Sequence, residues 1–190
     1  AMAAEAETRI TGKIGLVHVT AGPGGTNTIT GVAGAWVDSI PMLVIAGQVG
    51  TNVLKKRSGL RQLGTNELGL VDMIGSITKY AVTVTDPLSI RYHLERAVYL
   101  ATLGKQGPVW VEIPLDVQCA EVDAEKLGGM PDNEILRMST GRYVAGAARK
   151  VAEWLNDAKR PLVIAGNGVH LGFSEPLLRD FVERWSIPVV

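Results

Sequence analysis

Short β-branched apolar runs alternate along this chain with longer segments whose apolar residues recur at the helical period. This alternation is typical of a parallel sheet covered by helices. Each run is too apolar for a solvent-facing strand, so we expect an α/β fold in which the first three strands pair in one parallel sheet with helices on both faces. The predicted strands are residues 14–20, 42–46, 109–113, 162–165 and 187–190.

Helices are expected between these strands. Residues 86–104 form the clearest one, because Asp86 can cap it, Pro87 suits its first turn and Gly104 can end it. Apolar stripes of helical period predict the others. They cover residues 1–9, 26–37, 140–158 and 174–185.

The chain divides into two parts. Residues 114–139 hold no sustained period of either kind and contain two prolines and a Gly-Gly pair, which favours a linker. We therefore expect a first domain at residues 1–117, a linker at 118–139 and the beginning of a second α/β domain at 140–190. The first residues are helix-forming without a cap and the last lie in an apolar strand, so we expect the natural protein to continue in both directions.

The composition of the chain limits the classes of molecule that it is expected to bind. Of the 190 residues, 46% are hydrophobic, and Lys plus Arg and Asp plus Glu both count 19, so no basic excess favours nucleic acid or anionic membranes. Apolar runs such as residues 42–46 are far shorter than the roughly 20 residues that cross a bilayer. The single cysteine, Cys119, cannot form an internal disulfide. We expect a cytoplasmic protein without nucleic-acid or membrane partners.

A glycine-rich turn follows the first strand. Gly22, Pro23, Gly24 and Gly25 stand between that strand and the helix we expect to open at Thr26 and Asn27. Glycines allow a backbone to approach a ligand closely, and a helix start presents free N–H groups. The same turn is also a packing solution in many α/β proteins, so both interpretations stay open. It is not a Walker loop, because no Gly-Lys-Ser/Thr follows.

Two other groups of residues are candidate sites. Gly166, Gly168 and Gly172 follow a predicted strand and precede a helix, a spacing compatible with a dinucleotide diphosphate. The three histidines are scattered and none has the spacing of a metal pair, which favours structural roles. They are His18, His93 and His170.

The motifs as a set resemble a known family. Residues 20–49 read T-x-G-P-G-x-T-N, then a helix, and then D-S-I-P-M-x-V-I-x-G-Q-V. They are similar to the pyrimidine-binding domain of the acetolactate synthase, pyruvate oxidase and benzoylformate decarboxylase superfamily. Further matches extend this resemblance over residues 1–117. Residues 159–168 and 187–189 resemble the beginning of the family's Rossmann-like central domain.

The resemblance implies a thiamine-diphosphate-dependent enzyme that decarboxylates or joins 2-keto acids, with Mg²⁺ on the diphosphate. It also implies a homodimer or homotetramer, because the family's cofactor lies between the pyrimidine-binding domain of one subunit and the pyrophosphate-binding domain of its partner. Acetolactate synthases bind FAD through the central domain whereas many relatives do not, and the motif at Gly166 and Gly168 cannot choose between them. The alternative is a non-catalytic flavin- or nucleotide-binding module of the same fold.

Residue roles carry over only where the motifs match. The resemblance places cofactor-binding residues at Gly22, Pro23, Gly24, Asn27 and Asn66, and substrate-proximal residues at Asn66 and Glu67. No catalytic residue is expected in the chain, because the family's activating glutamate would precede Ala1, and Glu5 matches a position after it. A fragment of this kind is expected to be inactive alone.

Overall fold

The computed structural model describes residues 1–54, 59–139 and 145–190. They form two compact units, Ala1–Arg137 and Met138–Val190. The first contains a four-stranded sheet and its covering helices, and the second contains, at residues 145–190, three helices and one isolated β-bridge.

The sheet of the first unit has the order β1-β2-β4-β3, and all neighbouring strands are parallel. The expected strands at 14–20, 42–46 and 109–113 are confirmed as three of its members. The strand β3 was not expected, because it is only four residues long and half-buried, and so shows neither a continuous apolar run nor a clear alternation. The strands are β1 (Gly15–Val19), β2 (Met42–Gln48), β3 (Tyr80–Thr83) and β4 (Pro108–Pro114).

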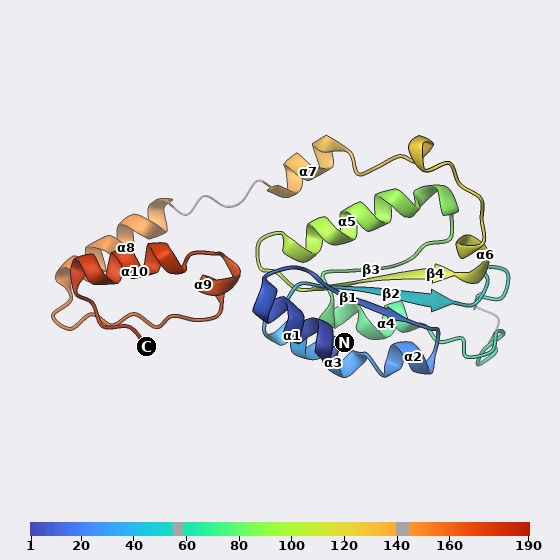
Figure 1. The fold of residues 1–190 in the computed structure, drawn as a ribbon, viewed down its shortest axis with the longest axis horizontal. Coiled ribbons are helices and arrows are strands. Elements are labelled where there is room, and N and C mark those ends of the chain that lie inside the picture. Colours follow the sequence, from blue (N-terminus) through green and yellow to red (C-terminus); the bar gives the residue numbers. More distant parts are fainter. Residues whose placement is uncertain (55–58, 140–144) are drawn as a thin grey trace. The chain divides into compact units, whose positions relative to one another are not determined.

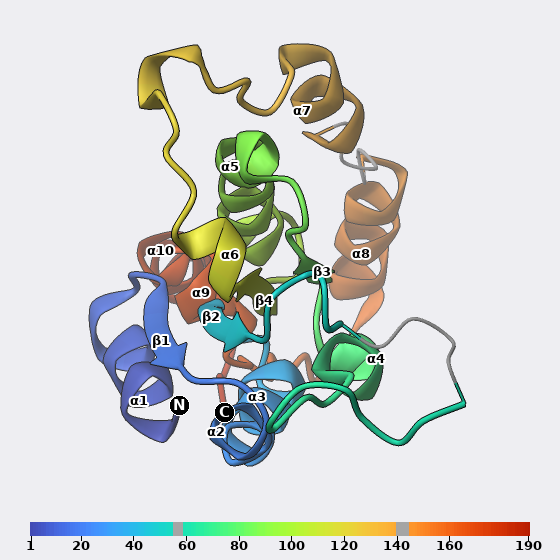
Figure 2. The ribbon, with the colours of Figure 1, turned by 90° about the vertical axis from the view of Figure 1, so that its right-hand side faces the viewer.

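Helices cover both faces of the sheet, as expected (Figures 1 and 2). One face carries α5 (Ile90–Thr102), and the other carries α1 (Met2–Thr11), α3 (Ile29–Val37) and α4 (Leu70–Ile74). The central strands are sealed between them, since Val44, Val109 and Trp110 have no exposed surface. A 3₁₀ turn, η1 (Gly75–Ile77), extends α4.

The helix predicted at residues 86–104 is present. Asp86 caps it, since its carboxylate accepts a hydrogen bond from the Leu88 N–H at 3.0 Å. The first turn is the 3₁₀ helix η2 (Pro87–Ser89), and α5 follows directly. Gly104 lies just beyond its end with a φ of 58°, the left-handed conformation typical of a glycine that ends a helix.

The prediction of one helix at residues 26–37 is wrong about where the helix begins. The structure has two helices, α2 (Pro23–Thr26) and α3 (Ile29–Val37). Proline at the first helical position and glycine before it allow helix to begin inside the glycine-rich turn. Asn27 therefore ends α2 instead of opening a helix.

Residues 115–137 contain more structure than their lack of period suggested. They form α6 (Leu115–Gln118), η3 (Ala124–Lys126) and most of α7 (Asp132–Ser139). The segment is fixed along α5 by an ion pair between Arg96 and Glu134 at 2.7 Å and by a hydrogen bond from Met130 N–H to the Glu95 carboxylate at 2.6 Å. Its order comes from these tertiary contacts, which no local pattern reveals.

The second unit contains α8 (Ala145–Asp157), α9 (Gly168–Leu171) and α10 (Glu175–Trp185). The start of the helix predicted at 140–158 lies outside the described residues. The strands predicted at 162–165 and 187–190 are wrong as regular strands, because they meet only in a parallel bridge between Val163 and Val189. Neither segment joins the sheet of the first unit.

Candidate functional site

The glycine-rich turn contacts a loop that is distant in sequence. Gly22 has a φ of 61° and a ψ of −120°, a conformation that side chains disfavour. A Cβ atom at Gly22 would also lie 2.8 Å from the Asn66 Cβ and closer still to the Asn66 carbonyl oxygen. The turn therefore needs glycine for two separate reasons. The structure brings Gly22 together with the segment at residues 59–69, called here the Asn66 loop.

The other predicted residues of the turn lie in α2. Pro23 and Gly24 form its first turn, and a Cβ atom at Gly24 would lie 2.6 Å from the Thr20 methyl group. Asn27 is exposed at the end of α2, where its N–H donates to the Pro23 carbonyl at 3.1 Å. Gly22, Pro23 and Gly24 thus form one corner at the carboxyl end of β1, with Asn27 one helical turn further along.

Asn66 and Glu67 are adjacent in sequence but differ in their surroundings. Asn66 is exposed and has a φ of 61°. Glu67 is only 6% exposed, and its carboxylate accepts hydrogen bonds from the N–H groups of Leu63 at 2.7 Å and Gly64 at 3.0 Å. This carboxylate stabilises the Asn66 loop from within, so of the two side chains Asn66 is the one open to a bound molecule.

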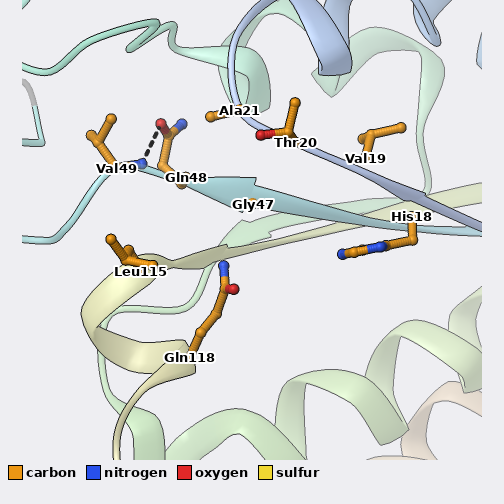
Figure 3. Close-up of a pocket in the computed structure, with 9 residues that line it drawn as sticks. All are labelled: His18, Val19, Thr20, Ala21, Gly47, Gln48, Val49, Leu115 and Gln118. Carbon is orange, nitrogen blue, oxygen red and sulfur yellow. Dashed lines mark hydrogen bonds between the residues drawn. The ribbon is translucent and has the colours of Figure 1, made fainter.

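A pocket of about 460 Å³ lies at the carboxyl ends of β1 and β2, beside the turn (Figure 3). His18 and Gln118 project on one side of the sheet edge and Thr20 and Gln48 on the other, with Gly47 between them. None of the lining residues is a lysine or arginine. The lining consists of His18, Val19, Thr20, Ala21, Gly47, Gln48, Val49, Leu115 and Gln118.

Sequence reasoning did not single out this lining. His18 was assigned a structural role, yet it is exposed on β1 and faces the pocket. Ligands of open parallel sheets bind outside the carboxyl ends of the strands. That rule, applied to residues 20–21 and 48–49 at the predicted strand ends, could have identified the pocket from sequence.

Behind the pocket lies a buried carboxyl group. Glu112 on β4 is 2% exposed, and its Oε2 accepts a hydrogen bond from the Thr83 hydroxyl at 2.8 Å. Burial raises the pKa of Glu112, because removal from water penalises the charged form, and the donor groups of Thr83, Gln48 and Trp110 offset part of this effect. Native Glu112 therefore holds its proton more tightly than in the unfolded chain.

This raised pKa makes the stability of the chain depend on pH. Stability contributed by Glu112 is fully present below its ordinary pKa of 4.5 and is lost as the pH rises through the folded-state value. We expect Glu112→Gln to gain stability over wild type as the pH rises from about 4 to about 8, by about 1.4 kcal/mol for each tenfold difference between the acid dissociation constants of Glu112 in the unfolded and folded chain. Urea unfolding across this range measures the difference. The exposed variant Glu125→Gln controls for the loss of one charge, and parallel curves for wild type and Glu112→Gln would contradict the prediction.

The glycines predicted for a flavin lie in the second unit. Gly168 begins α9, which is a single turn, and Gly166 precedes it; both are exposed. Among the described residues, no three His, Cys, Asp or Glu side chains are grouped so that they could hold a metal ion. No helix in this described part is both long enough and apolar enough to span a membrane.

Comparisons with known proteins connect this geometry with a family. Residues 1–71, which include the Gly22 turn and the Asn66 loop, match the family described as "Thiamine pyrophosphate enzyme, N-terminal TPP binding domain". Together with the relatives below, this match supports a fragment of a thiamine-diphosphate-dependent enzyme of the acetolactate synthase family. The resemblance seen in the sequence is confirmed.

Relatives match nearly the whole chain. It is 34% identical to the acetolactate synthase large subunit of Lactococcus lactis over 98% of its length, and 38% identical to that of Corynebacterium glutamicum over 99%. It is 34% identical to the acetolactate synthase isozyme 3 large subunit of Escherichia coli over 96%. The chain spans about a third of these relatives, covering 31%, 29% and 31% of their lengths.

Proposed function

We propose that the chain is the pyrimidine-binding part, with the beginning of the central domain, of a larger enzyme that carries out acetolactate-synthase-like carboligation of 2-keto acids. The observation that carries this proposal is the contact between Gly22 and the Asn66 loop at the carboxyl edge of the sheet. Both contact partners lie within residues 1–71, the segment that matches the cofactor-binding domain. The domain division at residues 117 and 140 is part of the proposal.

The residues present fit a flat, uncharged ring. Gly22 lets the turn pack directly against the Asn66 backbone, and Pro23 and Gly24 fix the direction of the corner. Asn27 and Asn66 are exposed and bring carboxamide groups, which can donate and accept hydrogen bonds. We assign cofactor binding to these five residues and proximity to the substrate to Asn66 and Glu67.

When bound, thiamine diphosphate supplies a thiazolium carbon that can add to a keto group and hold the electrons left when carbon dioxide departs. The chain's own residues bind and orient the cofactor and the substrate. The corner at Gly22 limits where a ring can lie, and the exposed side chains of His18 and Thr20, which line the pocket, offer hydrogen bonds to a small polar substrate.

Other parts of the proposal rest on relatedness to acetolactate synthases. Mg²⁺ would bind with the diphosphate, on residues outside those described here. A homodimer or homotetramer in the cytoplasm completes the proposal, and FAD at Gly166 and Gly168 stays a prediction from the sequence. The non-catalytic alternative is less favoured, because relatives across nearly the whole chain are named as acetolactate synthases.

An assay of the longer protein tests this function. The enzyme containing this chain, supplied with thiamine diphosphate and Mg²⁺, is expected to convert pyruvate to acetolactate with release of carbon dioxide. Omission of thiamine diphosphate is the control, and it should abolish the reaction. Cofactor-bound protein that leaves pyruvate and other 2-keto acids unchanged would refute the proposal.

A further inference from the structure

A buried carboxyl group sits at the carboxyl end of the sheet without contacting the pocket. Glu112 is level with Ala46 on β2 and Thr83 on β3, and it does not belong to the pocket lining. Its Oε2 is hydrogen-bonded, but within the described part of the chain its Oε1 and the neighbouring Trp110 indole N–H both lack a partner at hydrogen-bonding geometry. Burial of a carboxyl group with one unmatched oxygen costs stability. Packing therefore does not explain a glutamate here.

The carboxyl group connects to the pocket through one side chain. The Gln48 amide donates from Nε2 to Glu112 Oε2 at 3.4 Å and to the Leu68 carbonyl at 3.1 Å. Its Oε1 accepts from the Val49 N–H at 2.9 Å. Because both groups facing Nε2 are acceptors, a reversed amide would place oxygen against oxygen. Glu112 and Leu68 together fix which way Gln48 points, and Gln48 is only 5% exposed.

The hydrogen bond to Leu68 holds the end of the Asn66 loop. Leu68 adjoins Glu67, whose carboxylate closes the loop on the Leu63 and Gly64 N–H groups. The loop also packs on the strand end that carries Gln48, because a Cβ atom at Gly64 would lie 3.0 Å from the Val49 Cβ. The contact with Gly22 lies two residues before Leu68, at Asn66. A continuous set of contacts thus runs from Glu112 to the glycine corner.

We propose that Glu112 is a positioning residue that, through Gln48 and Leu68, holds the Asn66 loop against the Gly22 corner. A role in orienting cofactor and substrate rests on the proposed function, whereas the hold on the loop does not. Glu112 acts through Gln48 and touches no ligand itself. Thr83 binds the same carboxyl oxygen but not the loop, so it offers a matched comparison.

Hydrogen exchange in the 190-residue chain tests the hold directly. Gln48→Glu replaces the Nε2 donor with an oxygen that faces the Leu68 carbonyl and the Glu112 carboxyl group, so both hydrogen bonds are lost. Because the Asn66 loop is then held less firmly, we expect the N–H groups of Leu63, Gly64 and Glu67 to exchange about tenfold faster. Glu112→Leu should have a similar effect, and Glu112→Gln, which keeps an acceptor oxygen for Gln48, should stay within about twofold of wild type. Thr83→Val should destabilise the sheet but leave these three N–H groups within about twofold of wild type after correction for global stability.

Exchange that is unchanged in Gln48→Glu, or accelerated equally in Thr83→Val, would overturn the proposal. In the longer enzyme, Glu112→Leu should lower kcat about tenfold or more after correction for its change in thermal midpoint. Glu112→Gln should keep kcat near the wild-type value. A kcat that follows stability alone across the variants would also overturn it. If the longer enzyme has no activity towards 2-keto acids, the proposed function fails, while the exchange result still decides whether Glu112 holds the loop.

Discussion

Gly22→Ala is expected to destabilise the 190-residue chain by about 2–6 kcal/mol, a large part of the total stability of a typical domain. Two costs add. An alanine at a φ of 61° and ψ of −120° is strained, which costs about 1–3 kcal/mol. Its methyl group would also overlap the Asn66 backbone, and relief of such overpacking costs about 1–3 kcal/mol. Urea unfolding followed by circular dichroism measures the sum.

Gly104→Ala separates these two costs. Gly104 has a similar φ of 58°, but a Cβ atom there would have no atom within 4 Å. Only the backbone cost of about 1–2 kcal/mol should therefore appear. Equal losses for the two variants would mean that the Gly22 corner and the Asn66 loop are not in contact in solution. In the longer enzyme, Gly22→Ala should also weaken cofactor binding more than Gly104→Ala does.

The sequence allowed the first three strands of the sheet and its two covered faces to be predicted, because residues 42–46 and, apart from Glu112, residues 109–113 are apolar on both sides. The edge strand β3 was missed, since Tyr80–Thr83 is half-buried throughout and gives no period. Order at residues 118–137 was missed for another reason. Contacts such as Arg96 with Glu134 join residues far apart in the chain, and local patterns carry no information about them.

The candidate site was predicted in part. Gly22 and Asn66 were both named from the family motifs, but 43 residues lie between them, so their contact could only be seen in the structure. Gln48 was part of a matched motif without a role. Its role depends on Glu112, a charged residue in an otherwise apolar strand. Because charged side chains are rarely buried without a partner, a glutamate at such a position indicates that other polar groups contact it. The register that pairs β4 with β2 and β3 supplies the explanation.

The strongest functional expectation concerns the chain by itself. The 190-residue chain should bind thiamine diphosphate no more tightly than about 1 mM, about −4 kcal/mol, and should show no measurable decarboxylation of pyruvate. The diphosphate is a concentrated negative charge that requires cations or a metal ion. The pocket beside Gly22 has no lysine or arginine in its lining, and within the described ranges no acidic or histidine cluster could hold Mg²⁺.

Calorimetric titration in the presence of Mg²⁺ provides the measurement, and thiamine without its diphosphate is the matched ligand. Because the chain is proposed to contact only the ring, both ligands should bind it equally weakly, whereas the longer enzyme should prefer thiamine diphosphate by at least about 100-fold, about 2.7 kcal/mol. Micromolar affinity of the 190-residue chain for thiamine diphosphate, about −8 kcal/mol, would show that these residues hold the diphosphate themselves. The division of the cofactor site between this chain and further domains would then be wrong.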